Sequence, residues 1–316
     1  MESLYAHKIC LDVKSFISVL REQQYTSAPR LADSAWKRQE LFLVLAVGFT
    51  VWLLRLVLQK ILFSKIFHKY SVRIQRKLSE NLYYSIAYCL SFACGLLTWT
   101  LEDWRIDLFG PLLVELWSPY PPPLSTFFRC YYILELGYYL GSLAFLLLAD
   151  TKHSDFLEFF IHHVATILLV YISYSFRYVR IGLVILVLHD ASDVLLYSTK
   201  CVYYLGYRPF DSIMFIAFAV VFYFTRLFVF PRIIWGVAVD VIRLILRDHT
   251  FSGFASYWPV HFSHYFVCLF ALSTLEILHC FWFSLILKMI GRVVFASFEK
   301  LREEGDIRSD DEDESE

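Results

Sequence analysis

The sequence predicts an all-α, polytopic membrane protein: a helical bundle with about seven transmembrane helices. Hydrophobic residues make up 58% of its 316 residues, which is more apolar surface than a soluble domain of this size needs. Apolar runs recur along the chain, each near the ~20 residues with which a helix crosses a bilayer. Histidines and aspartates gather in two neighbouring runs, where burial in lipid makes ionisable groups costly and marks them as functional candidates.

The apolar runs define the predicted spans in chain order. Residues 1–38 have mixed composition and precede the first run, which we expect to stay in the protein as a signal anchor. The segment 236–263 combines apolar side chains with two arginines, which favours an interfacial or re-entrant stretch, with an eighth crossing as the alternative. The seven predicted spans are approximately 39–63, 81–101, 130–149, 158–176, 179–199, 210–235 and 264–291.

The distribution of lysine and arginine predicts how the spans are oriented. The loop 64–80 carries five basic residues, and further basic residues follow the last span. Because short basic loops stay on the cytosolic side, we place both segments in the cytosol. Seven spans then put the N-terminus on the opposite side, together with the loop 102–129.

Charge and cysteine content exclude several other classes of protein. Residues 301–316 contain nine acids and two bases, a net charge of −7, as in a disordered, solvated tail. The basic residues of the body are dispersed and form no nucleic-acid-binding motif. Seven scattered cysteines show neither a disulfide framework nor a zinc spacing. Ser309 and Ser315 lie among acids, as substrates of acid-directed kinases do.

The fourth and fifth predicted spans carry the candidate catalytic residues. His162 and His163 lie a turn inside the fourth span, whereas His189, Asp190 and Asp193 lie in the fifth. His189 and Asp193 are four residues apart and share a helix face, and Asp190 sits about 100° round the helix. A short turn joins the two spans, which predicts antiparallel neighbours. All five side chains are then expected at one depth, in the cytosolic half of the membrane.

A histidine beside a carboxylate is a poised base, acid or nucleophile. In a site closed to water, this set suits acyl transfer from an activated donor to an amine or hydroxyl. Two alternatives remain: a polar network that holds the helices together, and a metal site. Histidine-box enzymes need HxxHH spacings that are absent here, although three histidines and two aspartates could hold one zinc ion.

Later spans add candidate substrate-binding residues. His279 and Trp282 are three apart on one face of the last span. Arg226 lies inside the sixth span, where it could pair with a carboxylate or meet a phosphate. Glu135 lies deep in the third span, among tyrosines typical of an interfacial aromatic belt.

The segment 162–200 resembles the Lag1 motif of ceramide synthases, within the TLC membrane domain. The resemblance extends over about 75–292 and implies a six-helix TLC barrel, preceded by an N-terminal segment with the first span (1–74) and followed by the acidic tail (293–316). It also implies that residues of the motif outside the histidine and aspartate set contact the substrate. The matching elements are Asp155-Phe156, His162-His163, Ser173-Tyr174, Arg180, Gly182, His189-Asp190, Asp193 and Lys200.

The resemblance implies a sphingoid-base N-acyltransferase of the endoplasmic reticulum membrane, with acyl-CoA as co-substrate, no metal or other cofactor, and a cytosolic C-terminus. It leaves open a dimer or an accessory subunit. In this reading His162 or His163 attacks the thioester or acts as base on the amine, and His162 is the favoured acyl-bearing residue. Two departures from the family pattern bear on substrate preference: Phe176-Arg177 stand where asparagine is usual, and Tyr197 where glutamate is usual. The alternatives are a non-catalytic lipid-binding or insertion-assisting TLC protein and a metal-dependent lipid hydroxylase.

Overall fold

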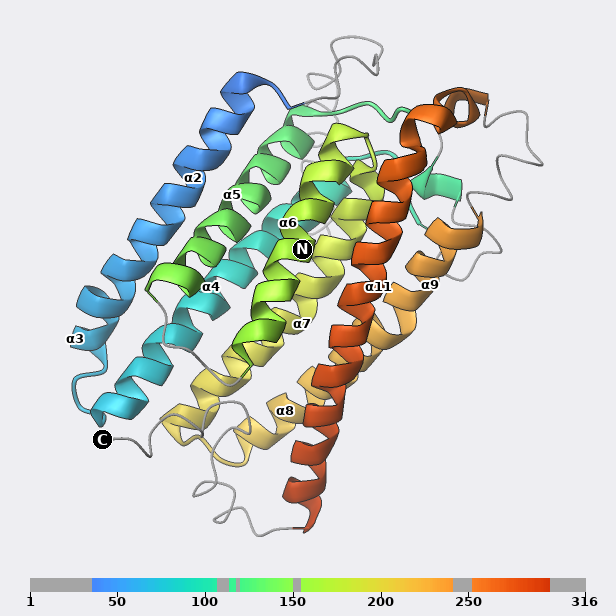
Figure 1. The fold of residues 1–316 in the computed structure, drawn as a ribbon. Helices are drawn as coiled ribbons and strands as arrows, with labels where there is room; N and C mark the ends of the chain where they lie inside the picture. Colours follow the sequence, from blue (N-terminus) through green and yellow to red (C-terminus); the bar gives the residue numbers. More distant parts are fainter. Residues whose placement is uncertain (1–35, 107–113, 118–119, 150–154, 241–251, 296–316) are drawn as a thin grey trace, which may run out of the picture.

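The structure is a computed structural model that describes residues 36–106, 114–117, 120–149, 155–240 and 252–295. These ranges are mainly helical and contain no β-strand, which confirms the predicted all-α class. Labels follow Figure 1. The elements are α2 (Arg38–Val57), the π-helix η2 (Leu58–Phe63), α3 (Ser64–Ile66), α4 (Val72–Thr100), the 3₁₀ turn η3 (Val114–Leu116), α5 (Thr126–Leu148), α6 (Phe156–Ser175), α7 (Val179–Leu205), α8 (Phe210–Phe222), the π-helix η4 (Tyr223–Val229), α9 (Phe230–Trp235), the π-helix η5 (Gly236–Asp240) and α11 (Ser252–Phe295).

The helices account for the seven predicted crossings. Six stretches of the described chain are long and apolar enough to cross a membrane, and they lie at 38–66, 72–100, 126–148, 156–175, 210–240 and 264–291. The remaining crossing, predicted as the fifth span, is α7, whose 27 residues also exceed the length of a crossing. It differs from the others by its charged side chains. The chain is therefore a polytopic membrane protein, as predicted.

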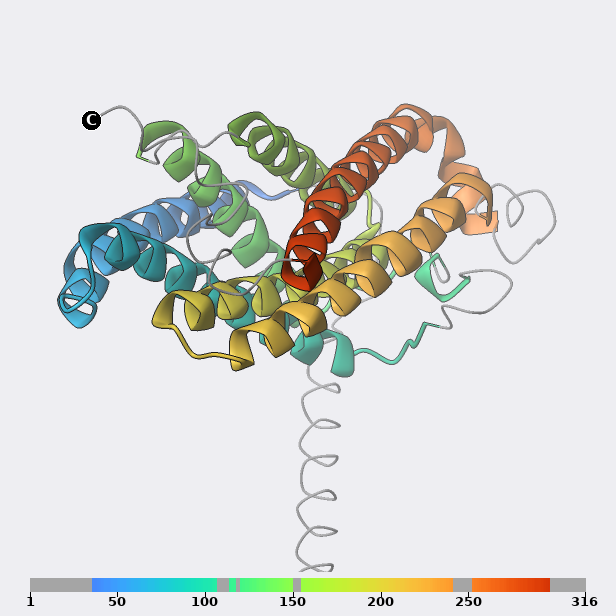
Figure 2. The same ribbon diagram turned by 90° about the horizontal axis from the view of Figure 1, so that it is seen from below.

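Six of the crossings close into a ring. α4 packs against α5, α5 against α6, and α6 against α11. α11 contacts α8 and η4, these contact α7, and α7 packs against α4, which closes the ring (Figures 1 and 2). The helix α2 lies outside this ring and packs along α5. This arrangement matches the barrel of six helices that the resemblance implied. It also directs one face of every ring helix toward a shared interior.

Glycines allow α2 and α5 to approach closely. A Cβ atom built on Gly141 would lie 2.5 Å from the Gly48 carbonyl oxygen, and one on Gly48 would lie 3.1 Å from the Gly137 carbonyl oxygen. Small residues of this kind replace hydrophobic burial as the basis of helix packing within lipid. The outer face of α2 is apolar and exposed, with Phe42 at 71% and Leu45 at 65% of full exposure, as expected of a lipid-facing surface.

A tight turn joins α6 to α7 and fixes their antiparallel packing (Figure 1). The Tyr178 amide donates to the Ser173 carbonyl oxygen at 2.7 Å, and Arg177 has a φ of 59°. Asparagine tolerates this left-handed backbone better than most residues, which gives a physical reason for the asparagine usual in the Lag1 motif at this turn. The turn sets the axial offset between the two helices and thereby the depth of their histidines.

One predicted boundary was wrong. The second crossing was expected from residue 81, but α4 begins at Val72 and incorporates nine residues of the basic loop, three of them basic. Lys77 is buried there, and its long apolar stem suits such a position. The last crossing lies at 264–291, as predicted, within a helix that already begins at Ser252. Residues 241–251 and the acidic tail lie outside the described residues.

Candidate active site

The ring encloses a cavity lined by six of the thirteen predicted site residues. It has a volume of about 240 Å³ and lies between α4, α6, α7, α8 and α11. Its wall includes the first turns of α6 and the second half of α7, so the short α6–α7 turn has brought the two ends of the motif together. The predicted residues that line this first cavity are His162, His163, Asp193, Lys200, Arg226 and Trp282.

A second cavity of about 70 Å³ begins on the other side of His162. Apolar side chains of α6, α7 and α11, such as Leu186 and Leu272, form most of its wall, and His189 is also part of it. His162 lines both cavities. A histidine shared by a cavity with charged side chains in its wall and a more apolar cavity can meet a molecule that occupies both.

The two histidines of the pair have different hydrogen bonds. Nδ1 of His163 lies 2.8 Å from the carbonyl oxygen of Phe159 and must donate to it, which leaves Nε2 as the basic nitrogen of the neutral ring. Nδ1 of His162 is buried and has no hydrogen-bond partner among the described residues. The edge of Trp282 packs against the His162 ring, with 5.4 Å between ring centroids. His162 is thus held by packing while its nitrogen stays available.

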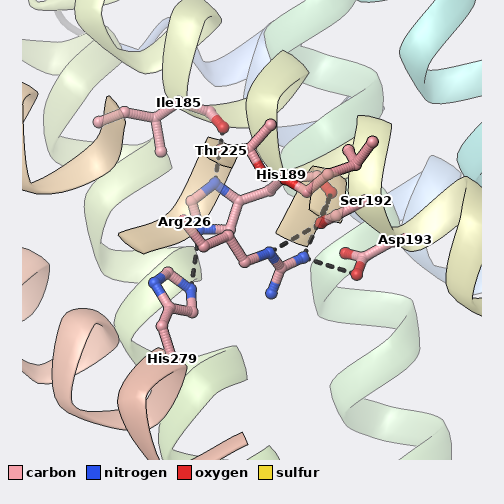
Figure 3. A network of polar contacts seen from close by, with 8 residues as sticks. Ile185, His189, Ser192, Asp193, Thr225, Arg226 and His279 are labelled. Atoms are coloured by element: carbon pink, nitrogen blue, oxygen red, sulfur yellow. Dashed lines mark hydrogen bonds and ion pairs between the residues drawn. The ribbon is translucent and has the colours of Figure 1, made fainter. Parts of the chain in front are cut away.

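Arg226 connects the sixth crossing to α7 (Figure 3). It lies in η4, and such π-turns occur often at functional sites. Its guanidinium donates to the Asp193 carboxylate at 2.6 Å, to the Ser192 hydroxyl at 2.8 Å and to the His189 carbonyl oxygen at 3.2 Å. Of the two roles considered for Arg226, the structure shows the pairing with a carboxylate. The ion pair holds Asp193 at the wall of the first cavity.

His189 contacts a histidine of the last crossing rather than Asp193. Its Nε2 lies 3.1 Å from Nε2 of His279, and its Nδ1 lies 2.7 Å from the carbonyl oxygen of Ile185 (Figure 3). His279 is completely buried. The sequence makes His279 a candidate substrate-binding residue, and the structure places it in direct contact with the predicted catalytic residue His189.

Asp190 occupies a different position from the other four predicted catalytic residues. It lies in neither cavity and is 1% exposed. The Ser91 hydroxyl of α4 contacts the Asp190 carboxyl at 2.5 Å and the Glu135 carboxyl at 2.6 Å. The 100° separation from His189 on the helix turns Asp190 toward α4 and α5. Of the five predicted side chains, His162, His163 and Asp193 therefore line the first cavity and His189 lines the second, whereas Asp190 lines neither. Asp190 instead contacts Ser91 beside Glu135.

Three residues of the motif lie toward the α6–α7 turn. Tyr174 donates to Glu40 of α2 at 2.8 Å, and Arg180 donates to the Glu115 carbonyl oxygen at 2.8 Å, so both hold the scaffold together at that end. Ser173 lines the second cavity, but its hydroxyl donates to the Tyr178 carbonyl oxygen at 2.9 Å. None of the three lines the first cavity.

Sequence reasoning missed several residues around the site. Tyr84 and Tyr88 of α4 line the first cavity, and Tyr197, the departure from the family pattern, stacks on Tyr84 with 4.6 Å between ring centroids. Glu276 lies one turn before His279. An isolated acid in an apolar span was a usable signal for Glu276, whereas tyrosines at a membrane interface are too common to be one. Within the described residues, no three His, Cys, Asp or Glu side chains converge as metal ligands.

Comparison with known proteins places the site within a conserved domain. The TLC domain model matches residues 77–288. The chain is 36% identical to ceramide synthase 4 of Bos taurus over 241 residues, which are 76% of this chain and 56% of that protein. It is 34% identical to ceramide synthase 3 of Homo sapiens over 75% of this chain and 56% of that protein. It is also 34% identical to ceramide synthase LOH1 of Arabidopsis thaliana, over 64% and 61%. The match spans between half and two thirds of the length of each relative.

Proposed function

The chain belongs to the TLC-domain family of membrane proteins, and on that premise we propose that it is a ceramide synthase: a sphingoid-base N-acyltransferase that uses acyl-CoA. The observation that carries the proposal is His162, whose Nδ1 has no hydrogen-bond partner among the described residues, at the place where the first cavity, with charged side chains in its wall, meets the apolar second cavity. The names of the similar proteins support the same reaction.

The two cavities suit the two parts of an acyl-CoA. Lys200 and Arg208 line the first cavity on the side where α7 ends and α8 begins, and cationic side chains there favour the phosphates of CoA. The apolar second cavity suits the methylenes of the acyl chain. An acyl-CoA that occupies both cavities would place its thioester carbonyl beside His162.

The proposed mechanism has two displacement steps. In the first, the His162 imidazole attacks the thioester carbonyl, the C–S bond breaks, and CoA leaves as the thiolate while the acyl group stays on His162. In the second, the neutral amine of the base attacks the acyl-imidazolium, the C–N bond to His162 breaks, His162 leaves as the neutral imidazole, and the amide forms. The amine loses one proton in this step, and Nε2 of His163 is the basic nitrogen positioned to take it.

The test of this proposal is direct. The purified chain in lipid vesicles should convert an acyl-CoA and a sphingoid base into the N-acylated product, followed by mass spectrometry. His162→Ala should lower the rate by at least about 10²-fold, and acyl-CoA labelled in the acyl group should label the wild-type chain but not the variant. Ser284→Ala, a change of an exposed hydroxyl on α11, is the matched control.

A wild-type chain that binds acyl-CoA or base but forms no amide would refute the enzyme and favour the lipid-binding alternative. An active His162→Ala variant would refute the assigned nucleophile. We further propose that the chain resides in the endoplasmic reticulum membrane with its C-terminus in the cytosol, where acyl-CoA is available to the first cavity.

A further inference from the structure

Glu276 is a carboxyl in the middle of an apolar crossing that the proposed mechanism does not use. It is the only acidic residue between 264 and 291, and 22% of its side chain is exposed. Its Oε2 lies 3.6 Å from Nδ1 of His279, one turn further along α11. Both atoms are buried and have no hydrogen-bond partner among the described residues. Ionisable groups are retained at such depth when they have a function.

Hydrogen-bond donors and acceptors determine where the protons lie. The Ile185 carbonyl can only accept, so Nδ1 of His189 carries a proton. The neutral His189 ring then has its lone pair on Nε2, which faces Nε2 of His279 at 3.1 Å. His279 must therefore donate from Nε2, which leaves the lone pair of its Nδ1 facing Glu276. A protonated Glu276 is the donor that completes this arrangement.

We propose that Glu276, His279 and His189 form a proton-transfer line that converts His189 into an imidazolium during acyl transfer, an inference that rests on the proposed function. Two protons each move by one position. The Glu276 proton passes to Nδ1 of His279, and the Nε2 proton of His279 passes to Nε2 of His189. The number of protons is unchanged, His189 becomes positive, and Glu276 becomes its negative counter-ion.

The position of His189 makes this charge useful. His189 and His162 line the same second cavity, so an imidazolium at His189 stabilises the oxyanion that forms when the thioester carbonyl is attacked at His162. His189 is the catalytic residue of the line. His279 and Glu276 line neither cavity and are positioning residues.

The surrounding charges explain why a carboxyl is needed. The groups near His279 are His189 from α7, Arg226 from η4 and His162 from α6. The charge of Arg226 is balanced by Asp193 at 2.6 Å. A second positive charge on His189 would have no counter-ion among these groups. The Glu276 carboxylate, on the far side of His279, is the counter-ion for that charge.

The experiment compares Glu276→Gln with Glu276→Asp and Cys280→Ala in the purified full-length chain in vesicles. Cys280 is the other neighbour of Glu276, with Sγ 3.8 Å from its Oε1, so its loss perturbs the surroundings but keeps the carboxyl. We expect kcat to fall about 10- to 100-fold in Glu276→Gln, with the KM for acyl-CoA unchanged. Glu276→Asp should recover part of the rate, and Cys280→Ala should match the wild type.

Solvent isotope effects distinguish proton transfer from a structural role. In mixtures of H₂O and D₂O the wild-type rate should depend on deuterium content along a curve, as expected when two protons move, whereas Glu276→Gln should give a smaller effect. An unchanged rate and isotope effect in Glu276→Gln would overturn the inference, as would an equal loss in Cys280→Ala. If Glu276→Gln does not fold, the isotope effect of Glu276→Asp decides. Absence of N-acylation by the wild type would instead overturn the proposed function.

Discussion

Ser91 has one hydroxyl proton and two carboxyl neighbours. The Glu135 and Asp190 carboxyls both lie within 2.6 Å of its oxygen, and one proton can serve only one of them. The second contact is a hydrogen bond only if a carboxyl itself carries a proton and donates to the Ser91 oxygen. The group therefore holds at most one negative charge, which is the arrangement that burial between three helices favours.

This proton count predicts unequal effects of two substitutions. Glu135→Gln keeps the shape of the side chain and a hydrogen donor, so the free energy of unfolding should change by less than about 1 kcal/mol. Ser91→Ala leaves two buried carboxyls without their shared partner and should cost about 1–3 kcal/mol. Thermal denaturation in detergent measures both. A larger loss in Glu135→Gln than in Ser91→Ala would contradict the shared proton.

At the scale of single residues, the sequence predicts contacts within a helix better than contacts between helices. The helical period placed His189 and Asp190 on different faces. It could not show that His189 faces His279 and that Asp190 faces Ser91, because those pairs depend on how each helix is rotated about its axis. Nor does the sequence reveal the π-turn η4, which changes the direction of Arg226.

At the scale of helices, the contact between α2 and α5 depends on backbone proximity. Gly141→Ala should therefore destabilise the chain by about 1–3 kcal/mol, because the added methyl group would collide with the Gly48 carbonyl oxygen. Gly291→Ala on α11 is the matched control: no atom lies within 4 Å of the added carbon, and alanine favours the helix by about 1 kcal/mol. Thermal melting of both variants checks the difference. Equal melting temperatures would show that α2 adjusts without cost.

Helix boundaries show what a hydropathy pattern can and cannot predict. Apolar runs located the crossings, because lipid requires about 20 apolar residues. The apolar runs did not locate the start of α4. Arg73 and Arg76 are typical of a basic loop, but in the structure they belong to α4, which extends beyond the apolar run. The fifth span, α7, is predicted from its apolar run like the others, although ionisable residues interrupt it.

At the scale of the whole molecule, the seven crossings within the described residues predict that the two termini lie on opposite sides of the membrane. Tags at the two ends should therefore respond differently in sealed microsomes, with the C-terminal tag accessible to antibody and the N-terminal tag accessible only after detergent. The basic residues at the start of α4 and the end of α11 support this orientation. Both tags on one side would mean an even number of crossings and would revise the depth of the site.

The charges of α7 also constrain how the protein is made. Asp190 and Asp193 lie near the centre of α7 and would each cost about 3 kcal/mol in a lone helix, so α7 is a poor candidate for insertion by itself. By the time it leaves the ribosome, α4 and α5 have already been synthesised, and they carry the Ser91 and Glu135 side chains that receive Asp190. Asp193 must wait for Arg226, which is translated later. Biogenesis of this chain therefore requires that α7 remain shielded, by its earlier neighbours or by an insertion factor, until the sixth crossing arrives.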